Sequence, residues 1–552
     1  MKVLIVSLAS QYIHSSLAPW YLYYSAKKSA KAGISVDVFE GTVNEEINSL
    51  YEKILSKNAD IVAFSCYIWN IESVKVLTQK LHQKGVKILL GGPEVSYNAG
   101  QLLREDYIDY IISGEGEEPF VNFVNCVYDG DDLALVSGLC FKSENKIHIS
   151  RPHATTLIPE SPYGDEFLAS LNGRIAYIET SRGCPFSCAF CLSGRLGSVR
   201  FFPMERAKED ILTLANSGSK IIKFVDRTFN ANKKRAYELW QFIIENYGIK
   251  IPKGVCFHFE IGGDLLREED FSLLEKSPKG LIQFEIGIQS FSKKTLSAIN
   301  RKTDVELLKS NIKRLCAMKN IHIHIDLIAG LPFEDYVTFR EGFNLAFSLG
   351  ADMLQLGFLK LLHGADMREK AAEYPCEFCC TPPYEVSSTP YMDDKDLKTL
   401  HFTENALDRF VGSGRFSRTN ELIFGVQKRN PFDTLTELGM FTGNDSKPLN
   451  EYVNLLYQFF GADCKALRDA LISDIATSVK SSVLPSSLIV PDKNLKAFKR
   501  FLEENPKTRR KKGVMRNVFL LYGEKCGAYV DYDEQADGKY ILKRIPFEIT
   551  SC

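Results

Sequence analysis

Short apolar runs alternate with amphipathic segments over about the first 150 residues of the chain. Five apolar runs have the length of buried strands, and they cover residues 3–8, 35–39, 61–65, 86–90 and 110–112. A helical pattern at residues 16–32 follows the first run. Buried strands separated by helices predict βαβ units with right-handed crossovers, and therefore a doubly wound parallel sheet. In such a sheet a ligand binds beyond the carboxyl ends of the strands.

A second series of apolar runs fills the middle of the chain, and a helical pattern follows each run. The six runs cover residues 175–179, 221–226, 255–260, 282–286, 323–328 and 353–358. Six βα units are too few to close an eight-stranded barrel, so the pattern predicts a partial (β/α)6 barrel that stays open. In barrels of parallel strands the chemistry gathers at the carboxyl ends of the strands.

The last third of the chain mixes helical patterns with a strand-rich end. The helical patterns cover residues 393–410, 449–460 and 494–504, and the strands cover 518–522 and 528–532. We therefore predict an α/β protein with four parts. These are a Rossmann-like domain (1–135), a linker with a hairpin around Glu144 and Asn145 (136–169), a partial barrel (170–365) and a mixed α+β C-terminal domain (366–552).

Composition narrows the class of protein. Of the 552 residues, 45% are hydrophobic and 25% are charged, and the formal net charge is −1, so neither disorder nor a nucleic-acid partner is favoured. No apolar run reaches the length of about 18 residues that a membrane span needs. The opening run is read as a first strand rather than a signal peptide, and fourteen cysteines in such a chain predict reduced thiols and a cytoplasmic location.

Three cysteines follow the first run of the barrel region with the spacing C-x3-C-x2-C, at Cys184, Cys188 and Cys191. Thiolates are soft ligands that favour iron–sulfur clusters or zinc. A zinc knuckle would need a fourth ligand nearby, yet no further Cys or His follows before Cys256 and His258. Three local thiols leave one iron of a four-iron cluster open, and an open metal position can bind a substrate or cofactor.

The motif resembles the signature of the radical S-adenosylmethionine (SAM) enzymes, down to the aromatic Phe190 just before the third cysteine. The resemblance implies a 4Fe–4S cluster whose open iron is chelated by SAM, and reductive cleavage of SAM to a 5′-deoxyadenosyl radical. It also implies, residue by residue, SAM contacts at the ends of the later strands. Glu285, Gln289 and Ser290 would lie near the ribose and methionine part, and Ile328 and Gly330 near the base.

Glycine-rich segments stand at the predicted carboxyl ends of the first sheet. They include Ser65, Gly91-Gly92-Pro93 and Gly114-Glu115-Gly116, and glycine permits positive φ and close approach of backbone to a ligand. With the downstream motif, this arrangement resembles the cobalamin-binding domain that precedes the core in one subgroup of radical SAM enzymes. The usual D-x-H-x-x-G motif is absent, so His14 is not expected on cobalt. The alternative is a Rossmann-like scaffold without cobalamin.

Other polar residues at the strand ends have two readings each. Asp226, Arg227 and Glu260 fit either a salt-bridged barrel rim or contact with SAM or substrate. His322 and His324 share one strand face, and with His258 they are read as ordinary polar residues rather than a catalytic set.

The C-terminal part contains two further patterns. Cys376, Cys379 and Cys380 suggest an auxiliary cluster, but adjacent side chains diverge, and free thiols are favoured. The basic run at 507–516 lacks interleaved aromatics and is read as a solvated loop rather than an RNA-binding surface. This part resembles the accessory domain of unassigned function in one cobalamin-type branch.

Together with the patterns, the resemblance implies a cobalamin-dependent radical SAM enzyme that abstracts hydrogen from its substrate, and methylating members of that family then transfer a methyl group from methylcobalamin. The alternatives are a radical SAM enzyme without functional cobalamin, such as a tRNA methylthiotransferase, and a non-enzymatic iron–sulfur sensor or electron carrier. A carrier needs neither a partial barrel nor an open iron. The expected partners are a small-molecule or peptide substrate and an external electron donor, flavodoxin or ferredoxin, with no membrane partner.

Overall fold

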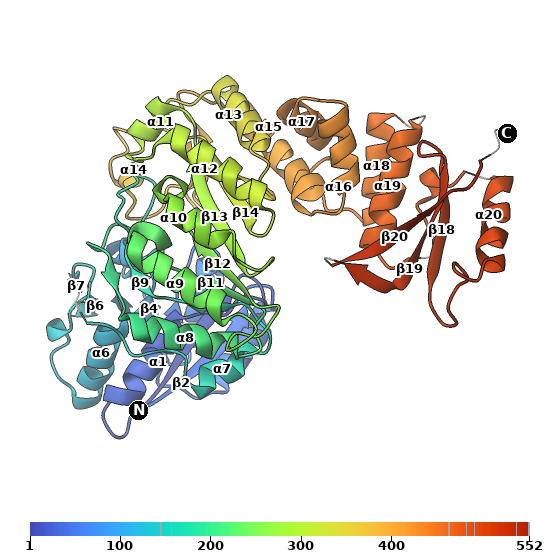
Figure 1. The fold of residues 1–552 in the computed structure, drawn as a ribbon. Helices are drawn as coiled ribbons and strands as arrows, with labels where there is room; N and C mark the ends of the chain where they lie inside the picture. Colours follow the sequence, from blue (N-terminus) through green and yellow to red (C-terminus); the bar gives the residue numbers. More distant parts are fainter. Residues whose placement is uncertain are drawn as a thin grey trace. The chain divides into compact units, whose positions relative to one another are not determined.

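The computed structural model describes residues 1–143, 146–155, 157–461, 464–481, 483–490, 492–536 and 538–549. The chain forms two units (Figure 1). The first contains Met1–Gly342, Leu349–Asp352 and Gly357–Asp394, and the second contains Phe343–Ser348, Met353–Leu356 and Lys395–Cys552. Among the described residues, none of the helices has the length and apolar character that crossing a bilayer requires.

The N-terminal domain is built on a sheet of order β2-β1-β3-β4-β5-β6-β7, whose first five strands are parallel. The strands are β1 (Lys2–Ala9), β2 (Ser35–Thr42), β3 (Ile61–Ser65), β4 (Lys87–Gly91), β5 (Tyr110–Ile112), β6 (Leu139–Ser143) and β7 (Lys146–His148). The helices are α1 (Ala18–Ser29), α2 (Ile47–Leu55), α3 (Ile71–His82), α4 (Pro93–Ser96), α5 (Ala99–Leu102) and α6 (Glu117–Asp129). The doubly wound parallel sheet is confirmed.

Alternation along the strands divides the core of this domain between the two faces of the sheet. Leu4 and Val6 of β1 pack in one apolar cluster with residues of α2 and α3. Val3 and Ile5 pack in a second cluster with residues of α1 and α6. Because successive side chains of a strand point to opposite faces, one continuous apolar run supplies both clusters.

The hairpin that was predicted in the linker belongs to the sheet. β6 pairs antiparallel with β5, and β7 pairs antiparallel with β6. The turn at 144–145 lies outside the described residues. The chain after the hairpin also stays on the domain, since Gly114 and His153 form a parallel bridge.

The central domain is a six-stranded sheet of order β15-β14-β13-β12-β11-β8, the open partial barrel that the sequence predicts. Its strands are β8 (Ala176–Ile178), β11 (Ile221–Phe224), β12 (Cys256–Glu260), β13 (Ile282–Gln289), β14 (His322–Ala329) and β15 (Met353–Phe358). Its helices are α7 (Asp165–Leu171), α8 (Met204–Ala215), α9 (Lys233–Asn246), α10 (Glu268–Leu274), α11 (Lys293–Ala298), α12 (Val305–Met318) and α13 (Tyr336–Ser348).

The two faces of the barrel strands differ in polarity. Phe224, Phe259 and Phe284 are fully buried and pack around Trp240 of α9. The opposite face carries ionisable side chains such as Lys223, which is paired in register with His258. Eight-stranded barrels usually fill their interior with branched apolar residues. In contrast, this six-stranded barrel is open, and its inner face is polar.

The remaining elements follow the barrel in chain order. The first unit ends with α14 (Asp366–Glu369), β16 (Glu377–Phe378) and β17 (Val386–Ser388). The second unit contains α15 (Asp394–Ala406), α16 (Ser417–Asn420), α17 (Pro431–Thr442), α18 (Leu449–Phe460), α19 (Lys465–Ser478) and α20 (Lys493–Glu504). It ends with the antiparallel sheet of β18 (Arg516–Leu521), β19 (Cys526–Ala536) and β20 (Lys539–Ile545).

Candidate functional site

The three cysteines of the motif lie in one loop, residues 183–199, which we call the cysteine loop. The antiparallel strands β9 (Ser181–Arg182) and β10 (Arg200–Phe201) close its base. The loop follows β8, so it stands at the carboxyl edge of the barrel strands. The thiols of Cys184, Cys188 and Cys191 are free and half-buried.

The three thiols influence one another. Burial raises the pKa of Cys188, Arg301 opposes that rise, and the charges of Cys191 and Cys184 add to it. Arg301 Nη1 lies 3.9 Å from Cys188 Sγ. Thiolates gathered in one place repel each other unless a cation holds them, so this donor set suits a metal centre.

The donor set fits an iron–sulfur cluster better than a single ion. Among the described residues, no three His, Cys, Asp or Glu side chains are close enough together to hold one metal ion. A four-iron cluster is a body several atoms across, and its thiolate ligands stand farther apart than those of one zinc ion. The loop supplies three soft ligands and contains no carboxylate or imidazole, which is the chemistry that such a cluster requires.

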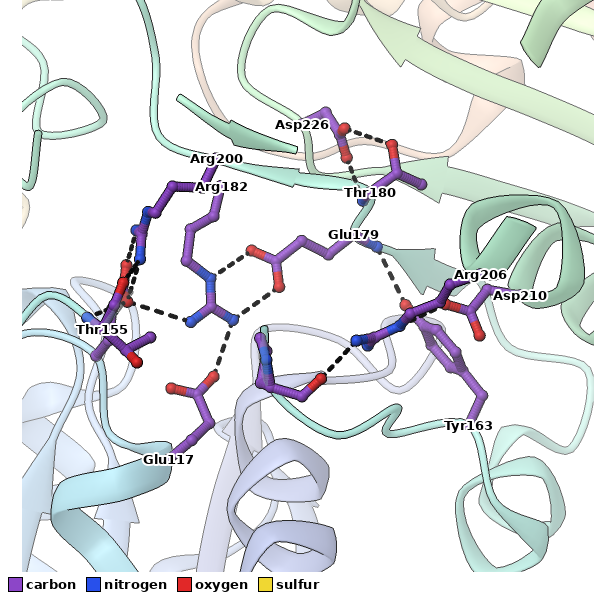
Figure 2. A network of polar contacts seen from close by, with 12 residues as sticks. Glu117, Thr155, Tyr163, Glu179, Thr180, Arg182, Arg200, Arg206, Asp210 and Asp226 are labelled. Carbon is purple, nitrogen blue, oxygen red and sulfur yellow. Dashed lines mark hydrogen bonds and ion pairs between the residues drawn. The ribbon is translucent and has the colours of Figure 1, made fainter. Parts of the chain in front are cut away.

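Asp226 fixes the base of the cysteine loop. Its carboxylate accepts hydrogen bonds of 2.7 Å from Thr180 N and Thr180 Oγ1 (Figure 2). It also accepts one of 2.7 Å from Ser181 Oγ. Burial raises the pKa of Asp226 to about 6, against the effect of these donors. Neither reading of Asp226 from the sequence describes this role, which is to anchor the strand that enters the loop.

The other side of the loop rests on the segment after α11 and on α14. Asn300 Nδ2 donates to Ser187 O at 3.0 Å and to Ser187 Oγ at 2.6 Å. Ala189 N donates to Ile299 O, and Ala189 O accepts from Met367 N at 3.0 Å. Phe190, the residue that follows Ala189, is half-buried.

Glu285 projects from β13 into the polar face of the barrel. Its Oε2 accepts from Lys223 Nζ at 3.0 Å and from His258 Nε2 at 2.8 Å. Burial disfavours the charged form, but His258 and Lys223 outweigh it and lower the pKa of Glu285 to about 2. Both donors use one oxygen, which leaves Oε1 available to a ligand.

Gln289 and Ser290 end the same strand. Gln289 has a positive φ of 71°, and its Oε1 is buried without a hydrogen bond in the described structure. Ser290 Oγ donates to Glu334 Oε1 at 2.5 Å, and Glu334 Oε2 is likewise buried without a donor. Two unsatisfied buried oxygens close to one strand end are expected where a polar ligand completes the site.

Burial and the nearby Asp335 raise the pKa of Glu334 to about 7, while Ser290 opposes the rise. The native state then holds this proton over a range, from about pH 4.5 to 7, in which the unfolded chain releases it. The free energy of unfolding therefore falls as pH rises through this window, by about 3 kcal/mol in total. We expect Glu334→Gln to unfold at a higher temperature than the wild type at pH 8 and at a similar temperature near pH 4.5, measured by calorimetry without cofactors. If the variant and the wild type unfolded at equal temperatures at pH 8 as well as at pH 4.5, this expectation would be wrong.

Ile328 and Gly330 lie at the end of β14 and just beyond it. Gly330 lines a small pocket together with Pro332, Phe333 and Met367. Cys376 also lines this pocket, whereas Cys379 and Cys380 are exposed, and their state as free thiols stays a prediction.

The two histidines of β14 lie next to aspartates, and Glu260 is influenced by an arginine. His324 Nε2 lies 3.0 Å from Asp326 Oδ1, and Asp326 outweighs burial to raise the pKa of His324. His322 is exposed and lies 4.0 Å from Asp352. Burial raises the pKa of Glu260, and Arg227 opposes it.

Arg301 is a site residue that sequence reasoning missed. Besides its contact with Cys188, its Nη2 donates to Gly287 O, and its Nε is buried without a partner in the described structure. It sits in a polar segment after α11 with no motif around it, so only the fold brings it to the cysteines.

The residues predicted to contact cobalamin gather at the carboxyl edge of the N-terminal sheet. Ser65 ends β3 and is paired in register with Gly91 at the end of β4. Beyond these ends stand the stacked rings of Tyr67 and Trp69, 4.4 Å apart, and Trp69 is 48% exposed. An exposed aromatic surface beside strand-end backbone suits a large, flat, partly apolar ligand.

Packing within the protein also explains two of the glycines. A Cβ on Gly92 would lie 2.5 Å from Cys66 O, and one on Gly114 would lie 2.2 Å from His153 O. Both residues have positive φ. Gly91 differs, because a Cβ there would have no neighbour closer than Ile112 O at 3.8 Å. Pro93 is the first residue of α4, and Gly116 precedes α6.

Residues 113–117, which we call the GEGE loop, reach the barrel. Arg182 lies between Glu117 and Glu179 (Figure 2). Arg200 donates to Glu115. His14 also contacts the barrel, since its Nδ1 is 2.8 Å from the hydroxyl of Tyr177. Hydrogen bonds therefore connect the GEGE loop to the base of the cysteine loop.

Comparison with known families assigns both domains. Residues 178–346 match the radical SAM superfamily, residues 6–124 match the B12 binding domain, and residues 372–518 match a protein of unknown function, DUF4080. The chain thus combines a B12-binding domain with a radical SAM domain.

Its relatives include cobalamin-dependent radical SAM methyltransferases. The chain is 28% identical over 313 residues to the 2-(S-pantetheinyl)-carbapenam-3-carboxylate methyltransferase of Streptantibioticus cattleyicolor, covering 53% of this chain and 45% of the relative. It is 27% identical over 385 residues to the cobalamin-dependent radical SAM methyltransferase TokK of Streptomyces tokunonensis, covering 65% and 55%. The chain spans about half the length of these curated relatives.

Two solved structures share the fold. The radical SAM methyltransferase TsrM from Kitasatospora setae, with cobalamin and a [4Fe-4S] cluster bound, has a TM-score of 0.56 at 18% identity, covering 67% of this chain and 74% of that chain. The cobalamin-dependent S-adenosylmethionine radical enzyme OxsB in its apo form has a TM-score of 0.63 at 15% identity, covering 83% and 74%.

Proposed function

We propose that the protein is a cobalamin-dependent radical SAM enzyme that transfers a methyl group to a carbon atom of a small-molecule substrate. The observation that carries the proposal is the position of the cysteine loop. Its three free thiols stand at the carboxyl edge of an open, polar barrel, and its base is bonded to the GEGE loop of a B12-binding domain.

With its cofactors bound, the site would supply one electron from the cluster to break a carbon–sulfur bond of SAM, and a methyl group from the corrinoid for the substrate carbon. Cys184, Cys188 and Cys191 would hold three irons. Arg301 offers a half-buried cation beside Cys188, which suits the carboxylate of SAM. Gln289 Oε1 and Glu285 Oε1 are acceptors free to receive amino or hydroxyl hydrogens of the ligand.

The surrounding residues also fix the charge of Glu285, the position of the thiols and the polarity of the segment expected beside the adenine base. Lys223 and His258 keep Glu285 ionised, so it acts only as an acceptor. The ordered base of the cysteine loop, fixed through Asp226, keeps the thiols beside the strand ends rather than in solvent. Ile328 and Gly330 present little polar surface, which suits the adenine base of SAM.

The test is anaerobic turnover of SAM. Reconstituted protein with a chemical reductant should form 5′-deoxyadenosine, and the yield of transferred methyl should depend on added hydroxocobalamin. A protein that binds iron but never consumes SAM would instead be an electron carrier or sensor. SAM cleavage that is indifferent to cobalamin would favour the second candidate, a radical SAM enzyme without functional cobalamin.

That second candidate has support among the relatives. A tRNA-2-methylthio-N(6)-dimethylallyladenosine synthase of Wolbachia pipientis is 26% identical over 243 residues, covering 43% of this chain and 55% of the relative. The near-zero net charge of the chain does not favour a nucleic-acid substrate. An external reductant such as flavodoxin or ferredoxin belongs to the proposal in either case.

Glu285 allows a sharp test of the SAM site. We expect Glu285→Ala to lower SAM cleavage about tenfold to a hundredfold with the iron content unchanged, because one hydrogen bond to a charged acceptor is lost. The measure is 5′-deoxyadenosine formed at subsaturating SAM.

A matched variant distinguishes loss of the proposed SAM contact from loss of the ion pair between Lys223 and Glu285. Lys223→Met also breaks the contact with Glu285 but keeps the carboxylate, so it should retain most of the cleavage rate. If both variants lose activity equally, Glu285 acts through the barrel and does not contact SAM.

A further inference from the structure

Arg182 joins three acidic residues from two domains. Its Nε and Nη2 donate to the two oxygens of Glu179 at 2.9 and 2.8 Å, and Nη2 also donates to Glu117 Oε1 at 2.8 Å. Its Nη1 lies 3.6 Å from Glu115 Oε2. Glu179 follows β8 of the barrel, whereas Glu115 and Glu117 belong to the GEGE loop.

A second arginine, Arg200, also connects the GEGE loop to the strands at the base of the cysteine loop. Arg200 donates to both oxygens of Glu115, with Nη1 to Oε2 at 2.8 Å, and also to Thr155 O. Thr155 N donates to Glu115 Oε2 at 3.0 Å. Arg182 and Arg200 are register partners in the two strands that close the cysteine loop (Figure 2).

These ion pairs are shielded from solvent, unlike most pairs on a protein surface. The side chains of Arg182, Glu117 and Glu115 are 15%, 12% and 7% exposed. Burial alone would lower the pKa of Arg182, but Glu117 and Glu179 outweigh it and raise the pKa. Exposed pairs contribute little, whereas removing one partner of a shielded, two-pronged pair leaves an uncompensated charge.

We propose that Arg182 is a positioning residue that couples the GEGE loop to the cysteine loop, so that a displacement of either loop moves the other. Arg182 lies two residues before Cys184, and Glu117 begins α6 of the N-terminal domain. The coupling sets the position of the cluster relative to the corrinoid, a consequence that rests on the proposed function.

The segments on the two sides of Arg182 differ in how firmly they are held. Asp226 pins Thr180 and Ser181 to the barrel on one side of Arg182, and the cysteine loop begins on the other side. Thr180 and Ser181 are thus held in place, whereas the cysteine loop, which begins at Gly183, is the neighbouring segment that a shift of Arg182 would move.

Hydrogen–deuterium exchange of the full chain without cofactors tests the coupling. In Arg182→Gln the amides of residues 113–117 and 181–184 should exchange together, about tenfold to a hundredfold faster than in the wild type. The decisive variant is Glu117→Gln, which changes only the N-terminal domain. It should speed exchange at residues 181–184, whereas a purely local role would leave them unchanged and overturn the proposal.

A matched control exists on the same pair of domains. Glu166 of α7 pairs with Lys27 of α1 at 2.5 Å, away from the cysteine loop in sequence and with its side chain 41% exposed. Glu166→Gln should leave exchange at 113–117 and 181–184 as in the wild type. Arg182→Lys keeps the charge but not the planar fork, so it should restore part of the protection lost in Arg182→Gln.

The loaded protein gives a second readout. Pulsed electron paramagnetic resonance between the reduced cluster and Co(II) should give a broader distance distribution in Arg182→Gln and Glu117→Gln than in the wild type or in Glu166→Gln. An unchanged distribution in both variants would overturn the proposal. A wild type that loads no iron or no corrinoid would instead refute the proposed function, because the exchange experiment needs neither.

Discussion

Replacing Cys184, Cys188 and Cys191 together by alanine is expected to remove the iron–sulfur cluster completely. The wild type, prepared anaerobically and reconstituted, should contain about four irons and four sulfides per chain, and the variant none. The physical reason is that the three thiols form one donor set at the barrel edge, and the variant leaves no soft ligand in the cysteine loop.

The iron content also shows whether the cysteine loop or the group of later cysteines holds the cluster. Cys376, Cys379 and Cys380 are the other candidates, and their triple alanine variant should keep a full cluster. If the first variant retained about four irons, the cluster would belong to the later cysteines. About eight irons in the wild type would mean that both groups bind one.

The second large effect concerns the corrinoid. We expect Gly91→Leu to abolish binding of hydroxocobalamin, measured as corrinoid absorbance that comigrates with the protein on gel filtration. A Cβ at Gly91 would have no neighbour closer than Ile112 O at 3.8 Å, so the first atom of a side chain fits there. Gly91 is the last residue of β4, so the added bulk would stand at the carboxyl edge of the sheet, where the corrinoid is expected. Unchanged circular dichroism is the control for folding.

The same experiment addresses cobalt ligation. His14→Ala should bind hydroxocobalamin as the wild type does, since the ring of His14 is already bonded to Tyr177 of β8. Loss of binding, or an altered cobalt spectrum, would mean that His14 reaches cobalt. Gly92→Leu would not serve here, because its side chain would collide with the backbone of Cys66 whether or not a corrinoid is bound.

The architecture was predictable because its signals are local. The barrel strands are short segments rich in apolar residues, many of them alternating with polar ones, and the runs predicted at residues 221–226 and 282–286 correspond to β11 and β13. The two halves of the N-terminal core also follow from alternation within single strands such as β1. The cysteine motif is equally local, since its ligands are separated by two or three residues.

The site was less predictable because its partners are distant in sequence. Arg182 lies 65 residues from Glu117, and Arg301 lies 113 residues from Cys188. Arg182 stands two residues before the cysteine motif, but nothing in the sequence indicates its acidic partners, and no motif surrounds Arg301. The glycines were read as room for a ligand, and the structure adds a second requirement at Gly92 and Gly114, whose partners are backbone atoms of other segments.

The hairpin of β6 and β7 has a practical consequence for dissecting the protein. β5 is only three residues long, and β6 covers its outer edge. A fragment ending at residue 135 would leave that edge unpaired, and it would also lack Thr155, which binds Glu115. Unpaired strand edges recruit strands from other molecules. An isolated N-terminal domain should therefore be expressed through residue 155 or beyond, since a shorter fragment would invite intermolecular strand addition.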